Sequence, residues 1–214
     1  MSISLQKTPE IIQHVQRLNQ FSIKQNLASE HSQIQGIYTI EYDSTNEKEE
    51  IVVTETEHSN YSLTTDKCMC LKAGNGMLLI DGERESQNCF SDILTVFSPA
   101  GFQLGSVRRR GFDLYSQYDI FDGNMKELFH LKSDPSEIVI LNHSNAIVAT
   151  ISHNTTNATF DISYQLETSA IEKFLILICV LMWTKHEQLY NESQDYCCRL
   201  ILRQLTLFLI SCIP

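Results

Sequence analysis

Between residues 21 and 164, short stretches of alternating apolar and polar positions are separated by clusters of turn-forming residues. Alternation with a period of two is typical of β-strands that bury one face. The turn clusters include Gly74-Asn75-Gly76, Pro99-Ala100-Gly101 and Asp122-Gly123-Asn124. The pattern predicts strands at 21–25, 37–42, 50–57, 77–81, 92–97, 103–108, 114–121, 126–132, 137–142, 146–153 and 159–164. So many short strands favour a closed barrel or a sandwich.

The strand pattern stops at the end of this region, where an apolar segment begins. From Phe174 to Trp183 the chain is apolar on every side of a helix, and Thr168 or Ser169 is placed to cap it. Ten residues of helix span about 15 Å, half of the bilayer's hydrocarbon thickness of about 30 Å. We therefore favour a helix buried in the protein over one that crosses a membrane. The helix residues predicted to be buried in protein or in lipid are Phe174, Leu175, Ile176, Leu177, Ile178, Val180, Leu181 and Trp183.

The two ends of the chain differ from the strand region. Thr8-Pro9 precedes apolar residues at helical spacing, which predicts a short amphipathic helix within a lead-in of residues 1–20. Residues 21–186 form the predicted barrel domain. Residues 187–214 contain a polar linker and the segment CCRLILRQLTLFLISCIP. This tail is compatible with a surface helix, a weak membrane anchor or an extension that does not pack.

Charge restricts the partners of the protein. The 214 residues carry a formal net charge of -10, and this opposes nucleic-acid binding, which needs many Lys and Arg contacts to phosphate. It also opposes adsorption of the whole surface to anionic lipid, so any membrane contact is expected to be local. The segment MSISLQKTPE has no apolar core typical of a secretory signal, and the seven cysteines are an odd number. We therefore expect a reducing cytosolic environment.

A run of three arginines, Arg108 to Arg110, interrupts this acidic chain at the end of a predicted strand. One interpretation is solvated residues where a strand meets a connection. The other is a local site for phosphate or for anionic lipid headgroups.

Four motifs follow one another along the chain: NCFSDILTVFSPAGFQLGSV, YSQYDIFDGNMKELFHL, AIVATISHN and TFDISYQLETSAIEKFLILICVLMW. Their order and spacing resemble those of the phospholipid scramblase family of the tubby-like superfamily. The first motif is similar to the family's cysteine-bearing strand, its Pro-Pro-Gly turn and the strand that follows, and the second motif to the next strand pair. AIVATISHN resembles a later strand, and TFDISYQLETSAIEKFLILICVLMW resembles the last strand with its hydrophobic helix. The resemblance covers residues 22–185.

The resemblance implies a mainly β fold, a closed antiparallel barrel of about twelve strands around the central hydrophobic C-terminal helix. It implies a phospholipid scramblase-like protein, associated with the cytoplasmic face of the plasma membrane, that moves phospholipids in both directions between the leaflets without ATP. The alternative is a membrane-associated lipid-binding or adaptor module that transports no lipid. No catalytic motif of a hydrolase or transferase stands out, so we do not expect an enzyme.

The resemblance also implies a calcium site and a lipid anchor. The family's twelve-residue calcium stretch falls on TNATFDISYQLE, where Glu167 keeps an acidic position and Asp161 is a displaced carboxylate. An ordinary strand with polar outward residues is the alternative. Of the family's palmitoylated cysteines, Cys89 remains before the DILTV strand, with Cys68 and Cys70 upstream. Burial in the sheet is the alternative for Cys68 and Cys70, and Cys197-Cys198 in the tail is an alternative acylation site. One acyl chain gives only marginal membrane binding.

Overall fold

The computed structural model describes residues 20–26, 37–43, 48–55, 66–73, 76–88, 91–110, 117–134, 137–154 and 159–184. These residues form twelve strands and a helix at residues 170–184, which we call the central helix. The strands are β1 (Gln20–Asn26), β2 (Ile37–Asp43), β3 (Lys48–Glu55), β4 (Asp66–Ala73), β5 (Leu78–Asn88), β6 (Ser91–Phe97), β7 (Gln103–Arg110), β8 (Gln117–Asp122), β9 (Glu127–Asp134), β10 (Glu137–Asn142), β11 (Ile147–Asn154) and β12 (Thr159–Tyr164).

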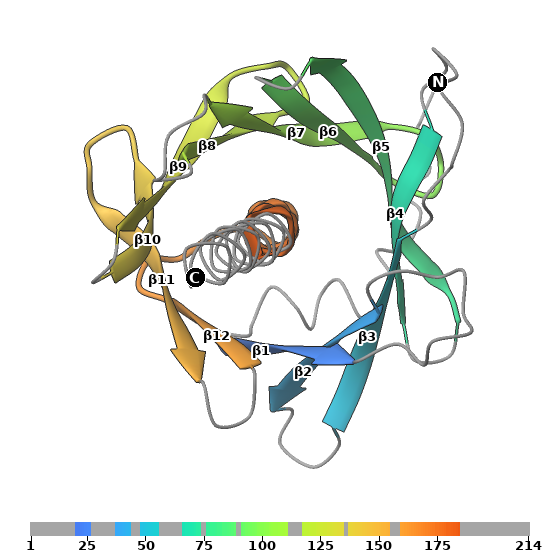
Figure 1. Cartoon of the computed structure of the whole chain (residues 1–214), viewed down its shortest axis with the longest axis horizontal. Coiled ribbons are helices and arrows are strands. Elements are labelled where there is room, and N and C mark those ends of the chain that lie inside the picture. The colour runs from blue at the N-terminus through green and yellow to red at the C-terminus, as the bar shows by residue number, and fades with distance from the viewer. Residues whose placement is uncertain are drawn as a thin grey trace, which may run out of the picture.

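The strands close into a barrel in the order β1-β12-β11-β10-β9-β8-β7-β6-β5-β4-β3-β2. Every pair of neighbours is antiparallel. A view along the barrel shows the central helix inside the ring of strands (Figure 1). The predicted fold, a closed antiparallel barrel around a hydrophobic helix, is confirmed.

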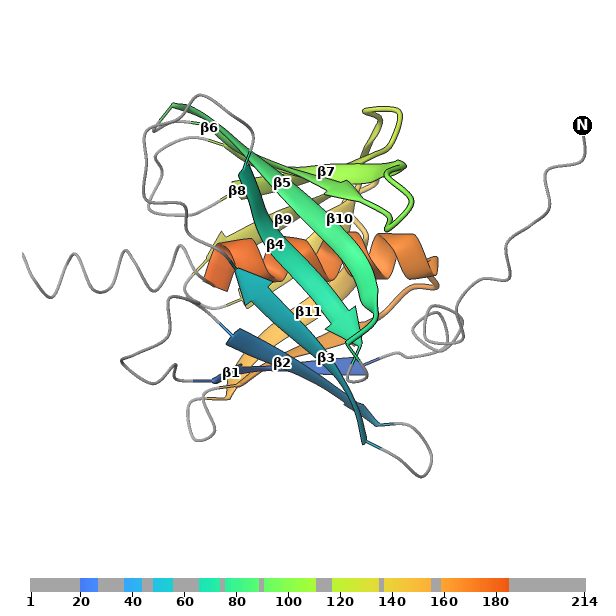
Figure 2. The same ribbon diagram turned by 90° about the vertical axis from the view of Figure 1, so that its right-hand side faces the viewer.

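Antiparallel neighbours place successive connections at alternate ends of the barrel. We call the end at which β12 leads into the central helix the entry end, and the opposite end the exit end. The connections β4–β5, β6–β7, β8–β9 and β10–β11 lie at the entry end. A side view shows the helix running along the barrel from the entry end toward the exit end (Figure 2).

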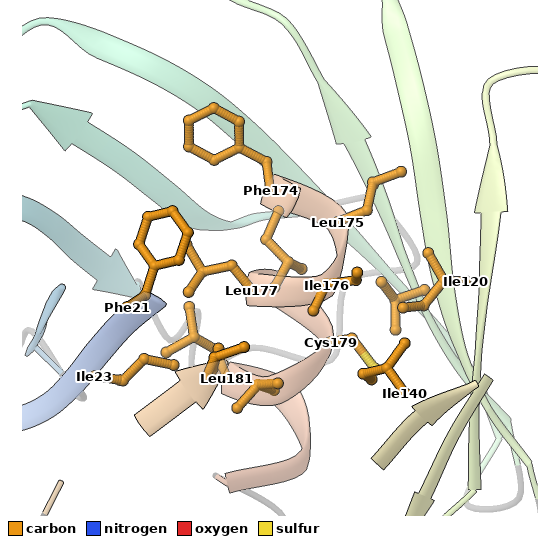
Figure 3. Close-up of a cluster of buried hydrophobic side chains, with 14 of the residues drawn as sticks. Phe21, Ile23, Ile120, Ile140, Phe174, Leu175, Ile176, Leu177, Cys179 and Leu181 are labelled. Atoms are coloured by element: carbon orange, nitrogen blue, oxygen red, sulfur yellow. The ribbon is translucent and has the colours of Figure 1, made fainter. Parts of the chain in front are cut away.

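The barrel and the helix share one apolar core. Figure 3 shows Phe21 and Ile23 from β1 on one side of the central helix, and Ile120 and Ile140 on the other. All four side chains are buried. Because alternate residues of each strand face inward, the strands present apolar surface to every side of the helix.

The central helix is therefore apolar on all faces because protein surrounds it. The eight helix side chains predicted to be buried are each exposed by 5% or less. Burial of a large apolar side chain contributes about 1.5–3 kcal/mol relative to exposure. With eight such side chains, this helix supplies a large share of the hydrophobic stabilisation of the fold. These residues are Phe174, Leu175, Ile176, Leu177, Ile178, Val180, Leu181 and Trp183.

A capping box starts the helix. The backbone amide of Ser169 donates to the Glu172 carboxylate at 2.7 Å, and the amide of Glu172 donates to the Ser169 hydroxyl at 3.3 Å. Two amides at the helix start thus gain side-chain partners. Of the two predicted caps, Ser169 fills the role.

One glycine lets the helix approach the wall. A Cβ atom at Gly105 would lie 2.3 Å from the Phe121 carbonyl oxygen and 2.8 Å from Leu175 Cδ1. Both distances are below van der Waals contact, so only a residue without a side chain fits between β8 and the helix.

Three neighbouring hairpins at the entry end use the same tight turn. In each, a backbone amide donates to a carbonyl three residues earlier, and the donating residue has a positive φ. A turn followed by a left-handed residue is common in three-residue hairpin loops. The bonds join Gly101 to Ser98 (2.8 Å), Met125 to Asp122 (3.0 Å) and Asn145 to Asn142 (2.9 Å).

The predicted strands differ from the observed ones in a few places. The pattern gave no separate strand at Asp66–Ala73, and it ended β5 at residue 81, whereas β5 continues to Asn88. Strand β7 extends to Arg110, so the arginine run lies inside a strand. The predicted N-terminal helix and the tail of residues 187–214 lie outside the described residues.

Candidate functional site

The three arginines of β7 do not form one patch. Strand residues alternate between faces, and β7 has Gly105 and Val107 on the face toward the central helix. Arg109 therefore shares the inner face, while Arg108 and Arg110 lie on the outer face. The headgroup prediction concerned all three side chains together, and the barrel wall separates them.

Arg110 is held by two carboxylates. Its Nε atom donates to Asp119 Oδ2, and its Nη2 atom lies 3.5 Å from Glu127 Oε2. The hydrogen bond and charge of Asp119 raise the pKa of Arg110 above its ordinary value. The Asp119 side chain is only 5% exposed, so this arginine compensates a nearly buried negative charge.

The other two arginines have partly enclosed guanidinium groups. Arg108 lies over the Phe121 ring, with its Cζ atom 5.3 Å from the ring centroid. The Nε atoms of Arg108 and Arg109 are buried and have no hydrogen-bond partner among the described residues. These positions are compatible with an anionic partner but also with packing along the wall, so the headgroup role stays a prediction.

The two carboxylates predicted for calcium lie on different elements. Asp161 is on β12 and accepts a hydrogen bond from the Ser22 hydroxyl on β1. Glu167 is exposed in the connection between β12 and the helix. In the part of the chain that the structure describes, no group of three or more His, Cys, Asp or Glu side chains is placed to hold a metal ion. Calcium binding by Asp161 and Glu167 stays a prediction.

The cysteines predicted to carry lipid fall in two regions. Cys68 and Cys70 are on β4, and Cys89 lies outside the described residues, between β5 and β6. The thiol of Cys70 is half-buried and donates to Asp81 Oδ1 at 3.3 Å. In the helix, Cys179 is buried, and burial raises the pKa of its thiol. Acylation of Cys68, Cys70 or Cys89 stays a prediction.

A buried lysine at the entry end escaped the sequence analysis. Lys173 is 3% exposed, and its Nζ atom lies 5.3 Å from the centroid of the Tyr164 ring. Burial lowers the pKa of Lys173, and the nearby charge of Glu167 partly offsets this effect. The available signal was a lysine directly before the apolar run that begins at Phe174.

Apolar side chains on the hairpin turns were also missed. Phe102, Met125 and Ile147 are exposed, at the ends of three consecutive hairpins. The alternation rule assigns apolar residues to the interior, so it gives no reason to place them at the surface. The available signal was the position of Phe102 and Met125 directly after the predicted turns at 99–101 and 122–124.

Comparison with known proteins adds little. No family model and no curated protein matches the chain. Among solved structures, an X-ray structure of an Arabidopsis thaliana protein matches with 19% identity over 57% of this chain and 88% of its own, at a TM-score of 0.30. A likeness this weak supports no inference about function.

Proposed function

We propose that the protein is a scramblase-like barrel that binds phospholipid at a membrane surface without carrying lipid across. The observation that carries this proposal is the enclosure of residues 174–183 by the strands. Its link to membranes comes from the motif order that resembles the scramblase family. We place the protein at the cytoplasmic face of the plasma membrane.

The character of the barrel interior argues against a lipid path along the helix. Between Lys173 and Thr184 the helix reads FLILICVLMW, without an ionisable group other than the buried Cys179 thiol. Moving a phospholipid headgroup through hydrocarbon is costly unless polar groups replace its water. This helix segment offers such a headgroup no replacement, and polar groups that the structure places inside the barrel, such as Arg109 and Lys173, lie on β7 and at the entry end. The described residues contain no helix of the length and hydropathy that a membrane crossing requires.

Scrambling is the second candidate, and the barrel itself favours it. The resemblance predicts a closed barrel around a C-terminal helix, and this is the architecture of the chain. A scrambling route in this protein would have to use the outer surface of the barrel. Polar residues lie on that outer surface, for example Asp161 and Ser163 on β12.

Reconstitution separates the two candidates. Purified full-length protein is incorporated into vesicles with a fluorescent phospholipid that a membrane-impermeant reagent quenches in the outer leaflet. Under the first candidate the inner-leaflet signal stays protected, with and without calcium, while the protein floats with the vesicles in a density gradient. Loss of the protected signal establishes scrambling. If that loss requires calcium, the result supports Asp161 and Glu167 as calcium ligands. Absence of flotation in every lipid mixture contradicts both candidates.

A further inference from the structure

Exposed apolar side chains gather at the entry end of the barrel. Among the described residues, the large apolar side chains that are exposed belong to connections or element ends on this side. Single exposed apolar residues are normal, whereas a group on one face indicates an interaction surface. The residues are Met77, Phe102, Met125, Ile147, Leu166 and Ile171.

Three of these residues lie on neighbouring hairpins. Phe102 is 72% exposed on β6–β7, Met125 is 51% exposed on β8–β9, and Ile147 is 40% exposed at the start of β11. Strands β6 to β11 are consecutive in the barrel, so the three turns lie side by side around part of the entry end. Figure 2 shows the β6–β7 and β8–β9 hairpins at the end where the helix begins. We call residues 99–103, 123–126 and 143–147 the hairpin tips.

Met125 occupies a backbone conformation that disfavours it. Its φ is 64°, in the left-handed region, and the matching turn positions hold Gly101 and Asn145. Glycine and asparagine suit this region, whereas a bulky side chain is strained there. The sulfur accepts a weak hydrogen bond from the Ser106 hydroxyl at 3.8 Å, but half of the side chain remains exposed. A strained apolar residue on a turn points to a role outside the turn itself.

Charge at the hairpin tips is opposite to that of the whole chain. None of the exposed tip residues is Asp or Glu, although the chain has 26 acidic residues. Asp122, at the base of one tip, accepts the amides of Asn124 (2.8 Å) and Lys126 (2.9 Å). Glu127, the next carboxylate, is ion-paired with Arg110. The titratable side chains left exposed on the tips are Lys126 and His143.

We propose that the hairpin tips insert into the interfacial layer of an anionic phospholipid bilayer, with Phe102, Met125 and Ile147 as apolar anchors and Lys126 on the lipid phosphates. This inference rests on the proposed function and names the surface that performs it. An acidic protein approaches an anionic surface most favourably through a region without carboxylates. Turns at the ends of hairpins are convex. A fluid lipid layer can deform around three convex apolar tips, whereas a protein partner would need a matching cavity for each turn.

Exposed apolar side chains continue from the tips toward the helix, where the exposed carboxylate of Glu167 also lies, so the region without carboxylates is confined to the hairpin tips. The backbone amide of Leu166 donates to the carbonyl oxygen of Val148 at 3.4 Å, which places Leu166 beside Ile147. Ile171, in the first turn of the central helix, is exposed at the same end. The insertion would therefore orient the barrel with the entry end toward the bilayer and the exit end toward the solvent.

Matched variants at equivalent turn positions test the anchors. Met125→Asn installs the residue that the β10–β11 turn uses, so it should leave the melting temperature unchanged or higher while weakening binding. Asn145→Met adds an apolar side chain to a neighbouring tip and should strengthen binding. The variant Phe102→Ser/Met125→Asn/Ile147→Thr should weaken the vesicle partition coefficient about tenfold or more. Partition is measured by flotation with phosphatidylcholine vesicles, with and without phosphatidylserine.

A second pair of variants tests the contribution of the Lys126 charge. Lys126→Gln should weaken binding to vesicles that contain phosphatidylserine, whereas Lys132→Gln, an exposed position farther along β9 on the barrel wall, should not. Circular dichroism melting curves establish that each variant is folded.

The outcomes separate this inference from the proposed function. If the wild-type protein floats with vesicles and all tip variants float equally, the tips are not the docking surface, although membrane binding stands. If the wild-type protein binds no vesicle, both proposals fail. If tip variants instead abolish self-association in analytical ultracentrifugation, with no effect on flotation, the surface is a protein interface and the inference is overturned.

Discussion

The hydroxyl group of Tyr164 donates a hydrogen bond to the backbone carbonyl oxygen of Lys173 at 3.2 Å, and this bond joins the end of β12 to the first turn of the central helix. Both residues are buried. The bond lies where the chain reverses from the barrel wall into its interior. It therefore helps to set the position at which the helix enters.

Removal of the Tyr164 hydroxyl tests this connection. Tyr164→Phe keeps the ring that packs edge-to-face against Phe21, with the ring centroids 5.8 Å apart, but loses the bond to Lys173. We expect the free energy of unfolding to fall by about 1 kcal/mol. Urea titration followed by circular dichroism measures the change. An unchanged midpoint would mean that the hydrogen bond does not contribute to stability.

The buried Lys173 predicts a dependence of stability on pH. Burial lowers the pKa of Lys173 from its ordinary value of 10.5, so above the folded-state pKa the unfolded chain binds more protons than the folded one. The energetic cost of the buried charge is thus fully present below the folded-state pKa and declines as the pH rises from there toward 10.5. Lys173→Met should stabilise the protein most below the folded-state pKa, and the gain should shrink as the pH approaches 10.5. A gain that does not vary with pH would assign the effect to packing alone.

Close contact at Gly105 predicts a large effect of a small change. Gly105→Ala would place a methyl group 2.3 Å from the Phe121 carbonyl oxygen, so the strand or the helix must move. We expect a loss of about 3 kcal/mol in stability, or failure to fold. Gly76→Ala is the control for backbone strain without crowding, because its φ is 82° and, its chain neighbours apart, no atom of the described residues lies within 4 Å of the new methyl group. Its loss should be about 1 kcal/mol. Equal losses would show that packing at Gly105 is loose.

The barrel was predictable because its determinants are local. Alternation and turn residues mark the strands from β6 to β12. The apolar run of ten residues is too short to cross a bilayer, and the barrel interior is the place that remains for it. Strand β4 reads DKCMCLKA, which has apolar residues but none of the β-branched or aromatic residues typical of strands, and the end of β5 reads GERESQN, which has no apolar side chain. Their place in the barrel is set by pairing with neighbours that have the strand pattern.

The candidate site was less predictable because it depends on which face each residue takes. Consecutive arginines in a strand must alternate between its faces, so the run could not form a single patch once β7 extended through Arg110. The partner of Arg110, Asp119, comes from the next strand and follows only from the register. The exposure of Phe102 and Met125 depends on hairpin geometry, which the alternation of apolar and polar positions alone does not reveal.

The Arg110–Asp119 ion pair predicts a structural role for Arg110. Arg110→Ala removes the partner of a carboxylate whose side chain is 5% exposed, so we expect the free energy of unfolding to fall by about 1–2 kcal/mol. Arg110→Ala combined with Asp119→Asn should recover part of that loss, which a double-mutant cycle in urea measures. Lys24→Ala, at an exposed lysine of β1, should change stability by about 0.5 kcal/mol or less. Flotation of Arg110→Ala with phosphatidylserine vesicles should match the wild type. A variant that keeps its stability but no longer floats would instead make Arg110 a ligand of the lipid headgroup.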